Sequence, residues 1–236
     1  MLAIELVNNI ALIIFIICIS IYGVGLLYKM KRPSWGERGF LNIMYGLWVK
    51  RMTDPKDTIV AVQTMRNLIM ITTFLPSAMI LLLGLLLSAP ASNDLNGLLS
   101  FSLPSNELYL HYKLLLFVAI IVFSVIMFLL SLRQMVRFSV LIGIPAELIE
   151  TISANQRKTA SKKKIFGYLN AEELKKDVFL RAMNRFTFGM RAIFYGITII
   201  LWFLSVYVFI IGTICLTIYL IVHHDVEPPH NGELPI

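Results

Sequence analysis

Charged side chains are scarce in this chain. They make up 15% of its 236 residues, while apolar residues make up 58%. A soluble domain has about a quarter charged residues, so the composition indicates that a lipid bilayer surrounds most of the chain. Cysteine is scarce as well. Cys18 and Cys215 lie inside apolar runs, where we expect small hydrophobic side chains and neither a disulfide nor a metal site.

The sequence also lacks a recognisable catalytic set. It contains no Ser–His–Asp pattern, no phosphate-binding glycine loop, no CxxC pair and no paired carboxylates spaced for acid–base chemistry. The apolar runs carry no ionisable residue away from their ends, which argues against an ion-coupled transporter, since such proteins place one near the membrane midplane. We therefore expect a non-enzymatic protein without a cofactor.

The C-terminal tail holds the chain's candidates for metal ligands, His223, His224 and His230. Imidazole suits Cu(II), Ni(II) or Zn(II). The spacing of these histidines is irregular and the tail is rich in proline, so the pattern favours a solvated tail over a metal site.

Four apolar runs dominate the sequence. They cover about residues 4–28, 68–89, 114–132 and 192–222. Each is long enough to cross a bilayer, which takes about 20 helical residues. The first run has no basic region before it and is too long for the apolar part of a signal peptide, so we expect it to be retained. The pattern predicts an all-α integral membrane protein, a single membrane domain with four transmembrane helices.

Basic residues are distributed unevenly around these runs. All of the 21 Lys and Arg residues except Lys113 lie between the first and second runs or between the third and fourth. The positive-inside rule then places residues 29–67 and 133–191 in the cytoplasm. It places residues 90–113, the tail 223–236 and both termini outside the cell membrane. Anionic lipid headgroups are the expected partner of such basic loops, and nucleic acid is not, because no aromatic-rich binding surface accompanies them.

Both cytoplasmic loops contain a predicted amphipathic helix. Over residues 37–52, apolar and aromatic residues mix with basic ones at helical spacing, which predicts a helix in the membrane interface with Trp48 and Arg51 as anchors. In the second loop, Asn170 precedes acidic residues, as at a capped helix start. We expect this helix to lead directly into the fourth run.

Polar side chains gather where the apolar runs meet the cytoplasmic loops. This polar inner layer consists of Gln63, Arg66, Asn67, Arg133, Gln134, Arg137, Asn184, Arg185 and Arg191. Residues four apart share a helical face, so Gln63 lies beside Asn67, and Arg133 beside Arg137. Two interpretations stay open. The layer consists of snorkelling anchors with interhelical hydrogen bonds, or it is a basic, amide-rich vestibule that binds an anion or a lipid headgroup.

Four stretches carry a family resemblance: "LWVKRM", "VQTMRNLIMITTFLPSAMILLLG", "SLRQMVRFSVLIGIP" and "MNRFTFGMRAIFYGITIILWFL". They resemble the uncharacterised membrane-protein family named Domain of Unknown Function 599. The matching positions are Trp48, Arg51, Met52, Gln63, Thr64, Arg66, Asn67, Met70, Arg133, Gln134, Leu141, Ile142, Gly143, Asn184, Arg185, Phe188, Gly189, Arg191 and Tyr195. The resemblance implies a four-helix membrane protein and no established activity. The shared positions include every residue of the polar inner layer except Arg137.

Two functions fit these expectations. In the first, copies of the chain form a homo-oligomeric channel or facilitator, and the polar inner layer is its basic vestibule. In the second, the chain is an accessory or structural subunit of a larger membrane complex, for example a respiratory or metal-dependent membrane enzyme. The expected partners are accordingly the bilayer and either further copies of the chain or other membrane subunits.

Overall fold

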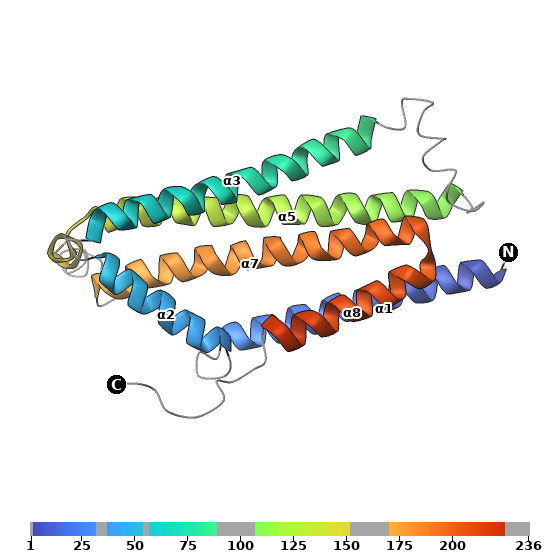
Figure 1. Ribbon diagram of the computed structural model, residues 1–236, viewed down its shortest axis with the longest axis horizontal. Coiled ribbons are helices and arrows are strands. Elements are labelled where there is room, and N and C mark those ends of the chain that lie inside the picture. The colour runs from blue at the N-terminus through green and yellow to red at the C-terminus, as the bar shows by residue number, and fades with distance from the viewer. Residues whose placement is uncertain (1, 32–36, 54–56, 89–106, 152–169, 225–236) are drawn as a thin grey trace, which may run out of the picture. The chain divides into compact units, whose positions relative to one another are not determined.

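The computed structural model of the chain describes residues 2–31, 37–53, 57–88, 107–151 and 170–224. These residues contain no strand. Their long helices are α1 (Leu2–Lys31), α2 (Glu37–Met52), α3 (Thr58–Ser88), α5 (Glu107–Ile142), α7 (Ala171–Leu204) and α8 (Val206–His224) (Figure 1). Much of the predicted outer loop and most of the tail lie outside the described residues.

Four helices are long and apolar enough to cross a membrane, judged by length and composition. The stretches concerned are Leu6–Tyr28, Ile59–Leu85, Tyr112–Ile142 and Ala171–Leu204. The prediction of an all-α protein with four such helices is therefore confirmed for the part of the chain that the structure describes. In these helices, the buried share of the most apolar window ranges from 11% in α3 to 44% in α7. Most of the apolar side chains face outward, as expected where lipid replaces water around a protein.

The predicted amphipathic segments are also helical. The segment over residues 37–52 is α2, with the predicted bounds. The second segment begins α7, directly after Asn170, whose carbonyl accepts the backbone N–H of Leu174. Acidic Glu172 and Glu173 occupy the first turn of α7, where the positive end of the helix dipole favours them.

The fourth apolar run forms two helices instead of one. The range 192–222 was expected to be a single span, but α7 ends before Ser205 and α8 begins after it. Neither proline nor glycine flanks this serine, so the local sequence carries no ordinary helix-breaking signal. The apolar part of α8, Val206–Val222, is shorter than the four long stretches. The 19 residues of α8 extend about 28 Å at the helical rise, which is close to the thickness of a bilayer core.

The chain divides into two compact units, and each is described by itself. Unit 1 comprises Met1–Asn42, Met79–Val125 and Met190–Ile236, and unit 2 comprises Ile43–Ala78 and Ile126–Gly189. The helices α2, α3, α5 and α7 each contribute one part to unit 1 and one part to unit 2.

Unit 2 is built around a cluster of aromatic rings. The ring of Phe179 lies 4.9 Å from that of Phe138 and 5.0 Å from that of Trp48, centroid to centroid. The buried core of this cluster also includes Val49, Met52, Ala61, Met65 and Ile142. The Ser131 hydroxyl of α5 donates a hydrogen bond of 2.7 Å to the carbonyl oxygen of Ala182 on α7. The unit therefore joins α2 and the first part of α3 to the facing parts of α5 and α7.

In unit 1, α7 and α8 form an antiparallel hairpin. The rings of Trp202 and Phe209 stack with centroids 4.5 Å apart and planes at 3°. The hydroxyls of Tyr195 and Thr217 lie 3.2 Å apart. The residue earlier on α7, Tyr195, contacts the residue later on α8, Thr217. The two helices therefore run side by side in opposite directions.

The first helix is antiparallel to α7 and parallel to α8. Trp202 Nε1 donates a hydrogen bond of 3.1 Å to Asn8 Oδ1, and further back on α7 the Tyr195 ring lies 6.2 Å from the Tyr22 ring. Helix α8 lies along α1 (Figure 1). The beginnings of α1 and α8 and the end of α7 consequently share one end of unit 1.

Candidate functional site

Three members of the polar inner layer lie on α3, in unit 2. Gln63, Arg66 and Asn67 are all exposed, while Ala61 and Met65 on the opposite side of the helix are buried in the core. The helix begins at Thr58, so these polar side chains lie in its second and third turns. Arg66 forms no ion pair within the described residues. The predicted shared face of Gln63 and Asn67 therefore points away from the unit.

On α5, the predicted residues separate onto two sides of the helix. Arg133 and Arg137 are exposed, whereas Gln134 is buried. Beside Gln134, Met135 is fully buried, and its sulfur accepts a hydrogen bond of 3.3 Å from the hydroxyl of Thr72 on α3. The structure thus brings the two arginines together on one face, as their spacing predicted, and turns the neighbouring amide inward.

The α7 residues of the layer lie closer to the interior. Asn184 and Arg185 are half-buried, and Arg185 donates a hydrogen bond of 3.2 Å to the carbonyl oxygen of Leu130 on α5. This guanidinium therefore links two helices of unit 2. Arg191, by contrast, belongs to unit 1.

The remaining predicted residues have local partners or fall outside the description. Trp48 stacks on Phe179 and is part of the aromatic cluster of unit 2. Arg51 is exposed and pairs with Asp57 at 3.2 Å. The side chains of His223 and His224, at the end of α8, are not among the described ones, and His230 also lies outside the described residues.

Lys113 is a buried cation of unit 1 that the sequence did not single out as a site. It is 6% exposed, and its Nζ donates a hydrogen bond of 3.1 Å to the carbonyl oxygen of Trp202. The same Nζ lies 5.3 Å from the centroid of the Trp202 ring. The last carbonyls of a helix lack intrahelical partners and carry its negative dipole end, so Lys113 caps the C-terminus of α7. Lys113 is the one Lys or Arg of the sequence that lies outside the two basic loops, and this was the signal that could have found it.

Lys175 makes the equivalent contact in unit 2. Its side chain is fully buried, and its Nζ donates a hydrogen bond of 3.0 Å to the carbonyl oxygen of Ile144, just beyond the end of α5. This lysine sits within a loop rich in basic residues, so nothing in the sequence distinguished it from its neighbours.

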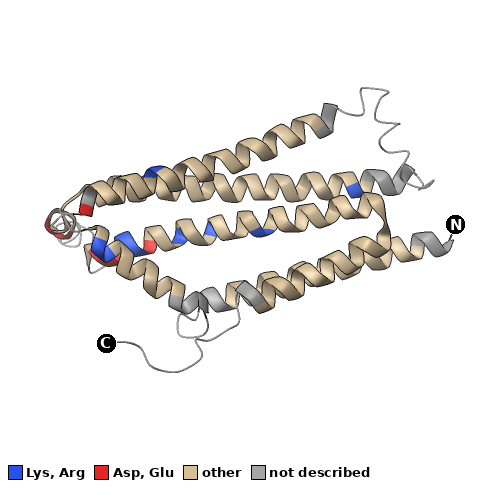
Figure 2. Cartoon of the chain, viewed as in Figure 1, with Lys and Arg blue, Asp and Glu red and all other residues tan. Residues whose placement is uncertain are grey.

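Arg191 is the third buried cation. It is 9% exposed, and its Nε is buried without a hydrogen-bond acceptor among the described residues. Its guanidinium carbon lies 6.0 Å from the ring centroid of Tyr22 on α1 and 5.9 Å from that of Phe194. Figure 2 shows that the basic positions of α7 lie toward the beginning of the helix, and Arg191 is the last of them in the sequence.

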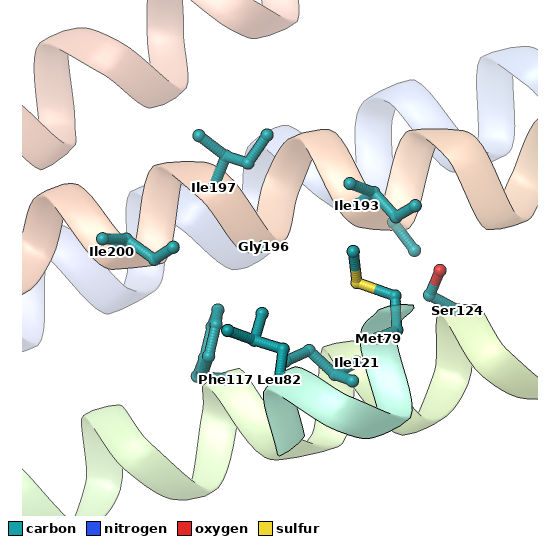
Figure 3. A pocket seen from close by; sticks show the side chains of 10 residues that line it. Met79, Leu82, Phe117, Ile121, Ser124, Ile193, Gly196, Ile197 and Ile200 are labelled. Carbon is teal, nitrogen blue, oxygen red and sulfur yellow. The ribbon is translucent and has the colours of Figure 1, made fainter. Parts of the chain in front are cut away.

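The described part of the chain has no cluster of metal-ligating side chains. Within it, no three His, Cys, Asp or Glu side chains group closely enough to hold a metal ion. Unit 1 contains an almost wholly apolar pocket of about 40 Å³, lined mainly by side chains of α3, α5 and α7 around Gly196 (Figure 3). That volume holds about three water molecules, and its apolar walls offer little to bind them. The pocket is therefore a small packing gap.

Of the comparisons with known proteins, the one with family models gives a match to the chain. No curated protein and no solved structure matches it. The family model described as "Protein of unknown function, DUF599" matches residues 10–228. The match includes every residue of the polar inner layer. Because it spans almost the whole sequence, the chain belongs to the DUF599 family, as the quoted motifs indicated.

Proposed function

We propose that the chain is a non-enzymatic membrane protein whose copies associate through α3 into a channel or facilitator for small anions. Gln63, Arg66 and Asn67 form the inner vestibule of this assembly. The observation that carries the proposal is the outward direction of these three side chains on the least buried of the long helices.

The chemistry of these side chains suits association between identical chains. Asn and Gln amides each donate and accept hydrogen bonds, so Gln63 and Asn67 of one copy can pair with those of another. A closed ring of copies would place several Arg66 guanidinium groups around one axis. Rings of Arg or Lys are a usual source of anion selectivity in pores.

The face of α3 becomes apolar further along the helix. Met70 and Phe74 are 63% and 70% exposed and follow the vestibule residues on the same side. Apolar constrictions gate channels by excluding water, and this pair is the proposed gate. Bulky apolar side chains also form sealed helix contacts, so the same two residues favour the second candidate, an accessory subunit of a larger membrane complex.

The parallel direction of α1 and α8 supports an orientation with the N-terminus outside the cell and the C-terminal tail in the cytoplasm. This revises the expectation that both termini are extracytoplasmic, which depended on a single span over residues 192–222. In the proposed orientation, α8 is a fifth crossing, and both basic loops remain in the cytoplasm as the positive-inside rule requires. We expect a tag after Ile236 to react with a membrane-impermeant label only after the cells are opened. Labelling of that tag in intact cells would overturn the fifth crossing.

The proposed function is tested on the purified protein by native mass spectrometry and by chloride flux into proteoliposomes. We expect a single oligomer of identical chains, and a flux that falls about tenfold or more in Arg66→Gln, because the vestibule loses its charge. Arg181→Gln is the matched control, since Arg181 is an exposed arginine of the same unit that already pairs with Asp177. A monomeric protein, or equal flux in both variants, would contradict the channel. Co-purification of unlike chains in a fixed ratio would instead support the accessory subunit.

A further inference from the structure

Unit 1 buries two cations under very different conditions. Its described side chains include two basic residues, Lys113 and Arg191, and no acidic one. Lys113 lies at a helix end and has the Trp202 carbonyl oxygen as its acceptor. Arg191 lies well inside α7 and makes no hydrogen bond or ion pair with the described residues.

The surroundings of Arg191 stabilise its charge only in part. The aromatic faces of Tyr22 and Phe194 attract a guanidinium, but at about 6 Å this attraction is modest. The nearby hydroxyl of Tyr195 is paired with Thr217 and is not directed to the arginine. A guanidinium stays charged under all physiological conditions, and a buried charge without acceptors is costly in a low dielectric. A bound anion would supply the acceptors that the described residues do not give this guanidinium.

The register of the helices gives the depth of this site. From Arg191 to the end of α7 at Leu204 is a rise of about 20 Å. Tyr22, which faces the arginine, lies in the second half of α1, and α8 approaches its own end at the same level. In a hydrocarbon layer of about 30 Å, this is the region just below the cytoplasmic headgroups, which a long arginine side chain can reach.

We propose that Arg191 binds a phosphate group beside α1 and α7, either the phosphate of an anionic lipid headgroup or free inorganic phosphate. The planar guanidinium matches two phosphate oxygens at once, and its terminal N–H groups, unlike the covered Nε–H, are the ones that an anion beside the helices can contact. Tyr22 and Phe194 hold the guanidinium in place from the side. The site lies in unit 1 and does not depend on the proposed association through α3.

The test measures thermal unfolding of the full chain in a neutral detergent, with three additions: phosphatidylglycerol, phosphatidylcholine and inorganic phosphate. We expect phosphatidylglycerol or inorganic phosphate to raise the unfolding temperature of the wild-type protein in a saturable way, and phosphatidylcholine to leave it unchanged. A response to phosphatidylglycerol alone identifies a lipid, and an equal response to inorganic phosphate identifies the free anion.

Three variants connect this response to the site. Arg191→Met keeps the apolar bulk of the side chain and removes the charge, so the midpoint concentration of the responding anion should rise about thirtyfold or more. Arg191→Lys should retain an intermediate response, because one ammonium replaces the planar fork. Arg181→Gln removes an exposed arginine of unit 2 that lies outside the polar inner layer, and it should respond like the wild type. The proposal fails if no anion stabilises the wild-type protein, or if Arg191→Met responds as strongly as Arg181→Gln. If Arg191→Met does not fold, an unchanged wild-type response in Arg191→Lys would also overturn it.

Discussion

The two units arrange their aromatic rings in different ways. In unit 2, the Phe179 ring contacts three others, at 4.9 Å from Phe138, 5.0 Å from Trp48 and 5.7 Å from Tyr45. In unit 1, the rings form a chain in which each contacts one or two others: Tyr22, Tyr195, Phe15, Phe209 and Trp202. Unit 2 therefore depends on one central ring, and unit 1 distributes its aromatic contacts along three helices.

Two rings in the aromatic chain of unit 1 also form hydrogen bonds, whereas the ring of Phe179 in unit 2 has no polar group that could form one. Trp202 donates to Asn8, and Tyr195 pairs with Thr217, so two rings of unit 1 are fixed by their polar groups as well as by packing. Polar groups that have no water to bond with must find partners inside a membrane protein. The difference teaches that the aromatic contacts of unit 1 are spread over several rings with polar partners, and that those of unit 2 meet at the ring of Phe179.

The largest effect is expected from Phe179→Ala. The ring is 2% exposed, and its loss leaves a cavity between α2, α5 and α7, which costs about 3–5 kcal/mol. Because Phe179 holds Tyr45 and Trp48 of α2, amide hydrogens of α2 should exchange much faster in the variant, as hydrogen-exchange mass spectrometry can measure. Phe209→Ala removes an equally buried ring of unit 1 as the control. If both variants leave the exchange of α2 unchanged, the central position of Phe179 is refuted.

The next effect compares the two lysine caps. Lys175→Ala and Lys113→Ala each leave a carbonyl oxygen at a helix end without its donor, and each should destabilise its unit by about 1.5–3 kcal/mol. The hydrogen bond of Lys113 is buried, whereas water can reach the half-buried Ile144 that Lys175 caps, so the loss should be greater for Lys113. The unfolding temperature of each variant in detergent provides the comparison. A rise in unfolding temperature on both substitutions would mean that the buried charge costs more than the cap contributes.

Two glycines of α7 test how tightly each unit is packed. A Cβ added at Gly189 would lie 3.1 Å from three atoms of the Phe128 ring, which is fully buried and cannot move aside, so Gly189→Ala should destabilise unit 2 by about 1–3 kcal/mol. A Cβ at Gly196 would meet Ile120 at 3.7 Å and Phe117 at 3.9 Å, ordinary contact distances beside the small pocket of unit 1. Gly196→Ala should therefore stabilise by up to about 1 kcal/mol, through better helix propensity and the added methyl group.

Opposite shifts in unfolding temperature for these two alanine variants would confirm the difference in packing. Equal destabilisation by both would show that α7 cannot accept a side chain on this face in either unit.

The sequence was sufficient for most of the helices and for part of the candidate site. Long apolar runs predict spans because a bilayer requires them, and the periodicity of a helix predicts that Arg133 and Arg137 share a face. The break at Ser205 could not be predicted, because no proline or glycine marks it and the apolar run continues on both sides. Tertiary contacts accompany the break, among them the stacking of Trp202 on Phe209.

The sequence also did not predict which basic side chains are buried. A lysine in a basic loop is expected to be solvated, so the burial of Lys175 depends on where the end of α5 lies in space. Arg191 was grouped with residues of unit 2 because it follows them on the same helix, while its contacts with Tyr22 come from a helix far away in sequence. Local patterns predict the face of a helix, and they do not predict which distant element covers that face.

The smallest effect is expected for two threonines of α8 in unit 1, whose substitution by valine should change the stability differently. Thr217→Val removes the hydroxyl that pairs with Tyr195, and the buried phenol is left without its partner, at a cost of about 0.6–1.5 kcal/mol. Thr213 is buried one turn earlier, and its hydroxyl has no partner among the described residues. Thr213→Val should therefore be neutral or slightly stabilising, since it replaces an unsatisfied polar group by a methyl group of the same shape. Both variants are compared with the wild type by thermal unfolding in the same detergent. If Thr213→Val is as harmful as Thr217→Val, the two hydroxyls contribute through packing alone, and the rings of unit 1 are then held by the same forces as the rings of unit 2.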